Sequence, residues 1–334
     1  MGAPAMCASF INARCSYPVL VSQNTRRPKR NRARIRKREG TSLGLSTRVI
    51  DIMETLIGRR ELWRLGRLIY RHARRDGHND PEINGEYALH RKVSEWAGRR
   101  NEPFNVIDIG ANIGYWSSHL LDECQRAGVK DINVWAFEPS DEIRVELTSR
   151  LQSLPAGYAV SIRSEAVSDE IGQAAFDATP GISGIKHLLT TAAQLDGDTP
   201  SVDVAVTTLT HVFEAEKIES ADFVKSDVEG FDLSALRGAA PLLAQGRIGL
   251  FQFEYNHCWI STRSFLKDVF ELVEGLPYLV CKVVPSGIDA YDAWHIELET
   301  FFETNYVLVR NDLLEVFDVR RGQFRADNTY ASNA

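Results

Sequence analysis

Hydrophobic residues recur along the chain in two patterns, and the change comes near Gly98. Before it, from Ser46 to Arg75, they return every three or four positions, which is typical of amphipathic helices. After it, short β-rich runs alternate with longer helical runs, and this alternation predicts βαβ units and a mainly parallel sheet. The predicted strands are Asn105–Ile109, Asn133–Phe137, Ala159–Arg163, Val202–Thr207, Phe223–Ser226, Ile248–Tyr255, Tyr278–Val284 and Asn305–Arg310. The predicted helices between them are Tyr115–Arg126, Asp141–Leu154, Leu233–Leu243 and Arg263–Glu274.

The N-terminal pattern predicts one or two helices, with Ser46 or Thr47 as the cap and Gly77 as the end. The second of them carries seven arginines on its polar side, which could suit a membrane surface. We favour a helix packed on the core with a solvated basic face.

The same pattern gives a domain plan. Residues 1–45 have too few apolar side chains to bury, and we expect a disordered basic tail there. A helical cap over 46–100 follows, with a further helix at Glu86–Trp96 leading into the core. We expect the catalytic domain over 101–324 and a frayed C-terminus over 325–334.

Charge separates the tail from the rest of the chain. Residues 1–50 hold eleven Lys/Arg and one acid, a balance of +10, and the overall charge of −6 therefore leaves −16 for the remainder. A nucleic-acid surface needs a basic patch on the folded domain, so nucleic acid is a disfavoured partner. A peripheral membrane contact through the basic N-terminus stays open.

Cysteine usage and hydropathy indicate the compartment. Five cysteines, odd in number and widely spaced, form no CxxC pair, so they predict neither a disulfide framework nor a structural zinc site. No stretch reaches the roughly 20 apolar residues that cross a bilayer. The expected location is the reducing cytoplasm.

A glycine loop follows the first predicted strand. In Asp108-Ile-Gly-Ala-Asn-Ile-Gly114 the two glycines remove Cβ atoms where the backbone turns and a ligand must come close. The helix that begins at Tyr115 offers free N–H groups to a polar or anionic group. The loop lacks the third glycine of a dinucleotide fingerprint and the Lys-Ser/Thr of a Walker loop, which disfavours a pyrophosphate ligand.

Two acids lie at successive strand ends. Asp108 precedes the glycine loop, and Glu138 ends the next strand, where doubly wound folds use a carboxylate to accept ribose hydroxyls. Either acid alone is a weak signal, because Asp108 could simply stabilise the loop. Their order and spacing by one βαβ unit make a stronger one.

These segments resemble the FkbM-type methyltransferase family. The resemblance covers about 81–311 and rests on the glycine loop, Ala136-Phe-Glu-Pro-Ser140, Ala166-Val-Ser-Asp169 and Val224-Lys-Ser-Asp-Val-Glu-Gly230. The lead-in Asp80-Pro-Glu-Ile-Asn-Gly-Glu-Tyr87 resembles the family as well. Two departures stand out: Ser226 replaces an apolar residue, and Thr210 stands where an acid is common.

The resemblance implies a class I, Rossmann-like α/β fold. It has a seven-stranded, mostly parallel sheet with helices on both faces, here preceded by the helical extension. It also implies S-adenosylmethionine as cofactor, with O-methylation the usual chemistry. By position, Asp108 and the loop Gly110, Ala111, Asn112 and Gly114 would hold the methionine end, and Glu138 the ribose. Glu165, Ala166 and Val167 would lie along the adenine, and Asp227 would face both cofactor and acceptor.

The catalytic candidates follow the fourth and fifth strands of that fold. Asp227 and Glu229 could activate an acceptor hydroxyl, whose proton is hard to lose at neutral pH, or could cap the next helix. Lys225 is either a participant or a salt-bridge partner. Glu254 and His257 could supply the base, or ligate a metal with Asp227, but without tight ligand spacing we predict no metal.

The expected function is therefore methyl transfer to a hydroxyl of a small-molecule, sugar or glycan-like acceptor. One alternative is an NAD(P)-dependent oxidoreductase, disfavoured by the two-glycine loop and the lack of an obvious Tyr-x-x-x-Lys pair. Another is an RNA- or membrane-binding protein that uses the basic tail. A third, RNA methylation, conflicts with the acidic remainder of the chain.

Overall fold

The computed structural model describes residues 32–76, 79–152, 158–180, 186–189 and 199–332. The chain divides into two units, residues 1–66 and 67–334. The helices are α1 (Arg32–Ile57), α2 (Arg59–Ala73), α3 (Glu86–Gly98), α4 (Tyr115–Arg126), α5 (Asp141–Leu151), α7 (Leu209–Glu216), α8 (Asp232–Gly238), α9 (Ala240–Ala244) and α10 (Leu266–Leu272), with 3-10 turns η1 (His257–Ile260), η2 (Ile296–Leu298) and η3 (Asn311–Leu313). The strands are β1 (Phe104–Ile109), β2 (Ile132–Phe137), β3 (Tyr158–Arg163), β4 (Ala166–Val167), β5 (Gly172–Asp177), β6 (Ser201–Thr207), β7 (Ala221–Ser226), β8 (Ile248–Tyr255), β9 (Tyr278–Val284), β10 (Gly287–Tyr291), β11 (Thr304–Arg310), β12 (Arg320–Phe324) and β13 (Tyr330–Ser332).

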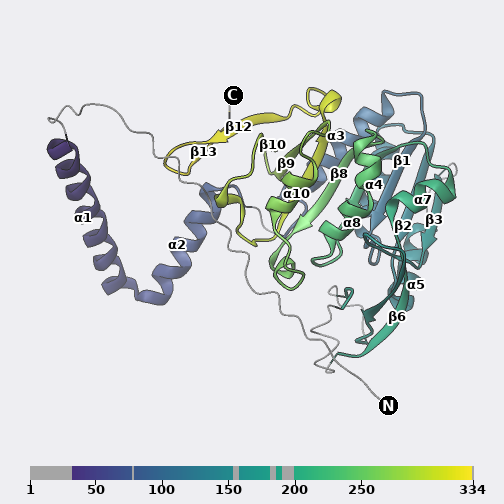
Figure 1. The fold of residues 1–334 in the computed structure, drawn as a ribbon, viewed down its shortest axis with the longest axis horizontal. Coiled ribbons are helices and arrows are strands. Elements are labelled where there is room, and N and C mark those ends of the chain that lie inside the picture. The colour runs from purple at the N-terminus through teal and green to yellow at the C-terminus, as the bar shows by residue number, and fades with distance from the viewer. Residues whose placement is uncertain (1–31, 77–78, 153–157, 181–185, 190–198, 333–334) are drawn as a thin grey trace, which may run out of the picture. The chain divides into compact units, whose positions relative to one another are not determined.

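The main sheet is larger than predicted. Among the described residues it has ten strands in the order β13-β12-β10-β9-β11-β8-β7-β1-β2-β3 (Figure 1). The half from β3 to β8 is parallel, whereas β11 runs antiparallel to both β8 and β9. The expectation of seven strands fits the part from β3 to β9. It is wrong for the whole sheet, because β10, β12 and β13 extend its edge.

A second, smaller sheet stands apart from the first. The predicted strand at Val202–Thr207 is present as β6, but it pairs with β4 and β5 rather than joining the main sheet. Phe176, Val204 and Val206 pack together with Ala166 and Leu188 as its apolar core.

Both faces of the main sheet are covered by helices (Figure 1). On β1, Val106 packs in a cluster with side chains of α3, α4 and α5, whereas the next residue, Ile107, packs with those of α7, α8, α9 and α10. Because central strands are buried on both sides, their sequences are nearly continuous apolar runs, which is why the strands could be predicted. The parallel strands therefore end at one shared edge, and the glycine loop and the Lys225–Gly230 segment both lie there.

The N-terminal helices differ from the prediction. Helix α1 begins at Arg32, inside the segment expected to be disordered, and Arg, Lys and Ala are favourable helix residues. Ser46 and Thr47 therefore lie within α1 rather than at its cap, and Gly77 lies outside the described residues. No helix in the described part of the chain is long and apolar enough to cross a membrane.

The unit boundary also departs from the domain plan. Helix α3, expected to belong to the cap, packs on α4 within the second unit, where Ser94 Oγ lies 3.3 Å from Cys124 Sγ. The division of the chain into tail, cap and catalytic domain stays a prediction.

Two segments after β7 also differ from the predicted secondary structure. The predicted helix Leu233–Leu243 is split into α8 and α9 near Gly238, where a Cβ would lie 2.0 Å from the carbonyl oxygen of Ser168. Part of the C-terminus expected to be frayed forms β13. There the Tyr330 hydroxyl donates to the Ala290 carbonyl over 2.9 Å, and its ring packs against Tyr291.

Candidate functional site

The glycine loop turns between β1 and α4 in a backbone conformation that favours glycine. Gly110 has φ +78° and Gly114 has φ +82°. A Cβ on Gly110 would lie 2.1 Å from the carbonyl oxygen of Asp227, so the backbone of the loop packs against the segment after β7 with no room for a side chain. Asn112 also has positive φ, at 49°, which Asn tolerates better than most residues.

Glu138 at the end of β2 ties this loop to the next one. One of its carboxylate oxygens accepts from the Asn112 N–H over 3.1 Å, and the other accepts from the Ser140 N–H over 2.8 Å. Burial raises its pKa, and the two N–H donors oppose that shift. Each oxygen keeps a further acceptor position, since a carboxylate offers about four lone-pair sites.

A cavity of about 680 Å³ opens beside Glu138. Its lining includes the predicted residues Gly110, Asn112, Glu138, Glu165, Ala166, Val167, Asp227 and Glu229. It also includes residues that the sequence did not single out, among them Ile143, Phe176, Lys186, His187, Leu188 and Val228. The predicted residues Asp108, Ala111, Gly114, Lys225, Glu254 and His257 stand outside this lining.

Asp108 instead belongs to a buried ionic network beneath the loop. It accepts from Ser117 Oγ over 2.6 Å, and its other oxygen lies 3.7 Å from Lys225 Nζ. Lys225 Nζ is also 3.3 Å from Asp227, and Glu86 on α3 contributes a third negative charge. Burial lowers the pKa of Lys225, but these carboxylates outweigh it and leave the pKa raised, so the lysine stays charged.

No role was predicted for Glu86, a residue whose charge acts on Lys225. It is the first residue of α3, it accepts from Gln252 Nε2 over 2.5 Å, and burial raises its pKa. The lead-in motif at Asp80–Tyr87 was the only signal for this residue, and it does not reveal that Glu86 lies near Lys225.

The two departures from the family pattern have structural explanations. Ser226 donates to Asp232 over 2.8 Å, and Asp232 also accepts from the N–H groups of Val228 and Gly230, so this buried acid shapes the loop after β7. Burial, followed by the charge of Asp227, raises the pKa of Asp232 to about 7. Thr210 Oγ1 donates to the Gly238 carbonyl over 2.7 Å, fixing α7 to α8.

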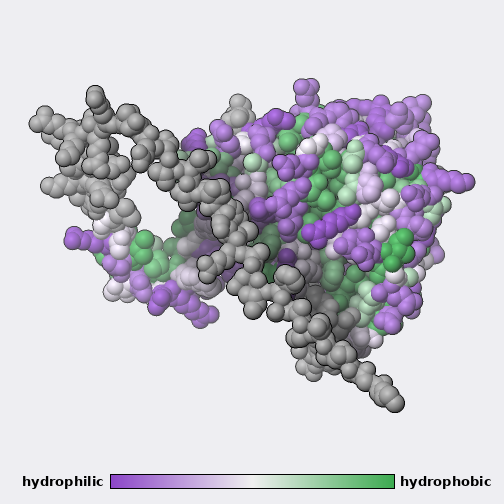
Figure 2. Space-filling view, in the orientation of Figure 1, coloured by the Kyte–Doolittle hydropathy of each residue, from purple (hydrophilic) through white to green (hydrophobic). Residues whose placement is uncertain are grey.

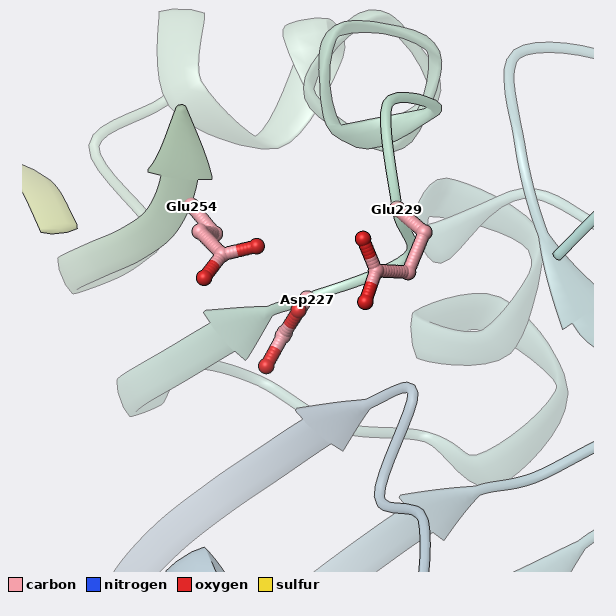
Figure 3. Close-up of side chains that lie close together, drawn as sticks. All are labelled: Asp227, Glu229 and Glu254. Carbon is pink, nitrogen blue, oxygen red and sulfur yellow. The ribbon is translucent and has the colours of Figure 1, made fainter. Parts of the chain in front are cut away.

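Three carboxylates converge at the ends of β7 and β8 (Figure 3). Single oxygens of Asp227, Glu229 and Glu254 lie within 4.8 Å of one another. Asn256 Nδ2 holds two of them, donating to Glu254 over 2.6 Å and to Glu229 over 3.3 Å. Three oxygens at this spacing could also share one divalent cation, and the expected absence of a metal stays a prediction.

Crowding perturbs the acids in this group. Burial, then the charges of Asp227 and Glu229, raises the pKa of Glu254 well above its usual range. The pKa of Glu229 is raised by the same kind of cause, burial first and Asp227 second. His257, predicted as a partner, is exposed at the start of η1 and lies outside this carboxylate group.

A second, small cavity has one of these carboxylates, Glu254, in its lining. It is lined by Asn79, Asn84, Glu254, Val283, Glu303, Thr304 and Asn305. Glu254 belongs both to this lining and to the carboxylate group, whereas Asp227 and Glu229 line the first cavity. The three acids therefore contribute to the lining of two cavities, a large, partly apolar one and a small polar one.

Comparison with known proteins identifies similar chains. A family model described as methyltransferase FkbM domain matches residues 108–279. The hexuronic acid methyltransferase AglP of Haloferax volcanii is 28% identical over 157 residues, which are 47% of this chain and 57% of that protein. The chain thus spans less than two thirds of the length of that relative.

Solved structures give more distant matches. Methyltransferase FkbM from Methylobacillus flagellatus aligns with a TM-score of 0.40 and 15% identity, over 62% of this chain and 43% of that one. A SAM-dependent methyltransferase from Agrobacterium tumefaciens aligns with a TM-score of 0.37 and 9% identity, over 70% of this chain and 63% of that one.

Proposed function

This chain belongs to the FkbM methyltransferase family and uses S-adenosylmethionine, and from that premise we propose that it methylates a hydroxyl group of an uncharged sugar or sugar-like acceptor. The observation that carries this proposal is the set of polar side chains that lines the small cavity at Glu254. When bound, the cofactor supplies an electrophilic methyl group on a sulfonium sulfur.

The residues of the first cavity fit that cofactor. Gly110 leaves the space that a Cβ would fill, and Glu138 has acceptor positions for ribose hydroxyls. Ala166, Val167 and Phe176 supply an apolar slot of the kind an adenine ring needs.

The second cavity has the composition of a sugar site. Asn79, Asn84 and Asn305 offer amide donors and acceptors, and Thr304 offers a hydroxyl. Groups that both donate and accept match sugar hydroxyls, which do the same. A hydroxyl placed next to Glu254 would lie beside the carboxylate group, two of whose members line the first cavity.

Glu254 is the group that we assign as general base. Its raised pKa makes it a stronger base than an ordinary carboxylate, and catalytic efficiency is greatest when that pKa lies near the working pH. Asn256 fixes its orientation through the bond to Oε2. The bound cofactor would supply the methyl group by breaking its methyl–sulfur bond, with S-adenosylhomocysteine as the leaving group. Glu254 would take the hydroxyl proton of the acceptor, while Asp227 and Glu229 would maintain the negative field that favours its protonation.

The same charges argue against an anionic acceptor. Glu254 and Glu303 line the acceptor cavity, Glu229 stands beside them, and the nearby cation Lys225 is already shared among three carboxylates. A like charge brought into this group would be repelled. The relative from Haloferax volcanii is named for hexuronic acid, and we propose that this chain differs from it in preferring a neutral sugar.

The experiment is methyl transfer from labelled S-adenosylmethionine to a panel of methyl glycosides. Neutral hexosides should be labelled in preference to a glucuronide, and the product should be an ether that resists mild alkali. Glu254→Gln should retain S-adenosylhomocysteine binding and lose transfer. Preferential labelling of the glucuronide, or an alkali-labile ester product, would contradict the proposal.

A further inference from the structure

A third cavity lies where the end of α2 meets β9, β10 and the segment from β12 to β13. It is larger than the cavity beside Glu138, shares no lining residue with either cavity described above, and belongs wholly to the second unit. On the face of this unit that Figure 2 shows, hydrophobic side chains lie in patches between hydrophilic ones, which is ordinary for a folded domain and marks no ligand site. The third cavity is therefore the feature that a ligand would fill.

The segment after α2, which forms one wall of this cavity, is fixed to the sheet by ion pairs. Lys282 on β9 pairs with Asp76, and both side chains are almost fully buried. Arg74 lies between two acids, with its guanidinium 3.0 Å from Asp76 and 3.0 Å from Glu297. This wall therefore has a defined place against β9 and η2.

The last turns of α2 are oriented by the same part of the protein. The guanidinium groups of Arg67 and Arg71 lie 5.4 and 5.5 Å from the ring centre of Phe302. At these two residues the basic side of α2 is thus turned toward the protein. This orientation is the reverse of the packed helix with a solvated basic face that the sequence favoured.

Every charged side chain that lines the third cavity has a partner of opposite charge. Arg75 pairs with Asp289 over 3.3 Å, in addition to the pairs that Arg74 and Lys282 make. A charged ligand would have to displace one of these pairs, and a partly buried charge that loses its partner is strongly destabilising. The ionic groups therefore favour an uncharged ligand.

The hydroxyl of Tyr291 is a polar group without a partner. Tyr291 ends β10 and is 6% exposed, and within the described part of the chain its hydroxyl makes no hydrogen bond. It is not among the fully enclosed unpaired atoms of those residues, so it opens on the cavity that the residue lines. Asn328 and Thr329, between β12 and β13, add an amide and a hydroxyl to the lining. A purely apolar ligand would leave the Tyr291 hydroxyl unpaired, whereas a hydroxyl-bearing ligand would satisfy it.

Aromatic rings supply the apolar part of the lining. The ring centres of Phe324 and Tyr330 lie 6.0 and 4.8 Å from that of Tyr291. Tyr70 on α2 also lines the cavity, and its hydroxyl donates to Glu297 over 3.0 Å. A sugar ring has the matching chemistry, because its C–H faces are apolar and the hydroxyls at its edge both donate and accept hydrogen bonds.

We propose that the third cavity is a second carbohydrate site, which binds an uncharged saccharide against Tyr70, Tyr291 and Phe324. The aromatic rings contact the faces of the sugar, and the Tyr291 hydroxyl bonds to one of its hydroxyl groups. Binding there requires neither S-adenosylmethionine nor Glu254. The inference therefore goes beyond the proposed function and does not depend on it.

Saturation-transfer NMR and equilibrium titration of the full chain test this site. The ligands are the methyl glycosides of glucose, galactose and mannose, with maltose, lactose and cellobiose, and S-adenosylmethionine is left out. At least one of these saccharides should bind, and a methyl glucuronide should bind more weakly. Tyr291→Phe should weaken binding about fivefold, since it removes one hydrogen bond. Tyr70→Ala should weaken it by about as much, since it removes an aromatic surface.

Matched controls separate this site from the acceptor cavity and from effects on folding. Tyr158→Phe removes a hydroxyl outside all three cavities and should bind the saccharide normally. Asn305→Ala alters the lining of the acceptor cavity and should also leave this binding unchanged. Tyr291→Phe should unfold at the temperature of the wild type, because the hydroxyl that it removes has no partner in the protein.

Three results would overturn the proposal. The first is that no saccharide of the panel binds. The second is binding that Asn305→Ala abolishes and Tyr291→Phe leaves unchanged, which would place the saccharide in the acceptor cavity alone. The third is that adenosine, an uncharged heterocycle with hydroxyl groups, binds in a Tyr291-dependent way and the saccharides do not. The experiment measures no methyl transfer, so its failure is distinguishable from failure of the proposed function.

Discussion

Replacing Gly110 by Ala tests how the fold builds the proposed cofactor site. The new Cβ would lie 2.1 Å from the Asp227 carbonyl oxygen and 3.1 Å from Val228 Cγ1, contacts too short to persist without movement. Relief requires the glycine loop and the end of β7 to separate. The first cavity is lined by both segments, so the substitution acts on the cavity itself.

The loss of folding free energy that we expect for Gly110→Ala has two parts. Placing Ala at φ +78° costs about 1–2 kcal/mol, because left-handed backbone brings Cβ close to a carbonyl oxygen. Forcing an extra carbon into a closely packed position costs about 1–3 kcal/mol more. We therefore expect a loss of about 2–5 kcal/mol in the free energy of unfolding, together with a severe loss of S-adenosylhomocysteine affinity.

Gly128 supplies a matched control. It has nearly the same backbone, with φ +76°, but nothing lies within 4 Å of its Cβ position. Gly128→Ala should therefore show the backbone cost alone and bind the ligand normally. Urea unfolding and calorimetric titration of both variants measure the difference. If Gly110→Ala were no less stable than Gly128→Ala and bound the ligand as tightly as the wild type, the inferred contact between the two loops would be refuted.

The acids of the site give two further predictions. Burial and its acidic neighbours raise the pKa of Glu254, so kcat should rise with pH through that raised pKa. Glu254→Gln should lower kcat by about 10²–10⁴ and flatten the dependence of kcat on pH. An unchanged pH profile in this variant would count against the role of Glu254 as base. Burial raises the pKa of Asp232 from 3.8 to about 7, so the folded state binds this proton more tightly than the unfolded chain does. Asp232 should therefore make the free energy of unfolding fall as the pH rises between these two values, by at most about 1.4 kcal/mol per pH unit. Urea unfolding across this range should show a smaller fall for Asp232→Asn than for the wild type, and equal slopes would contradict the shift.

Features encoded by local patterns could be predicted from the sequence. The central strands are apolar runs because both faces of the sheet are covered, and the glycine loop is recognisable because its backbone excludes side chains. Glu138 was found from its place at a strand end. The chain order of these segments identified the fold and the family.

Features that depend on distant pairing could not be predicted. Val202–Thr207 has the pattern of any strand, and nothing local shows that it joins the smaller sheet. The segment Lys186–Leu188 reaches the cavity beside Glu138 through a bridge between Leu188 and Phe176, without periodicity of its own. Glu86 lies far from Lys225 in the sequence, and the direction of the arginines on α2 depends on Phe302, which lies in another segment.

The central claim is that the cavity beside Glu138 holds the methyl donor. Equilibrium titration with S-adenosylhomocysteine and with NAD, on the wild type and on Glu138→Ala, tests it most directly. Glu146→Ala, an exposed acid on α5, serves as the control. We predict that the wild type and the control bind S-adenosylhomocysteine and not NAD, and that Glu138→Ala binds neither. Normal S-adenosylhomocysteine binding by Glu138→Ala, or preferential binding of NAD by the wild type, would contradict the account.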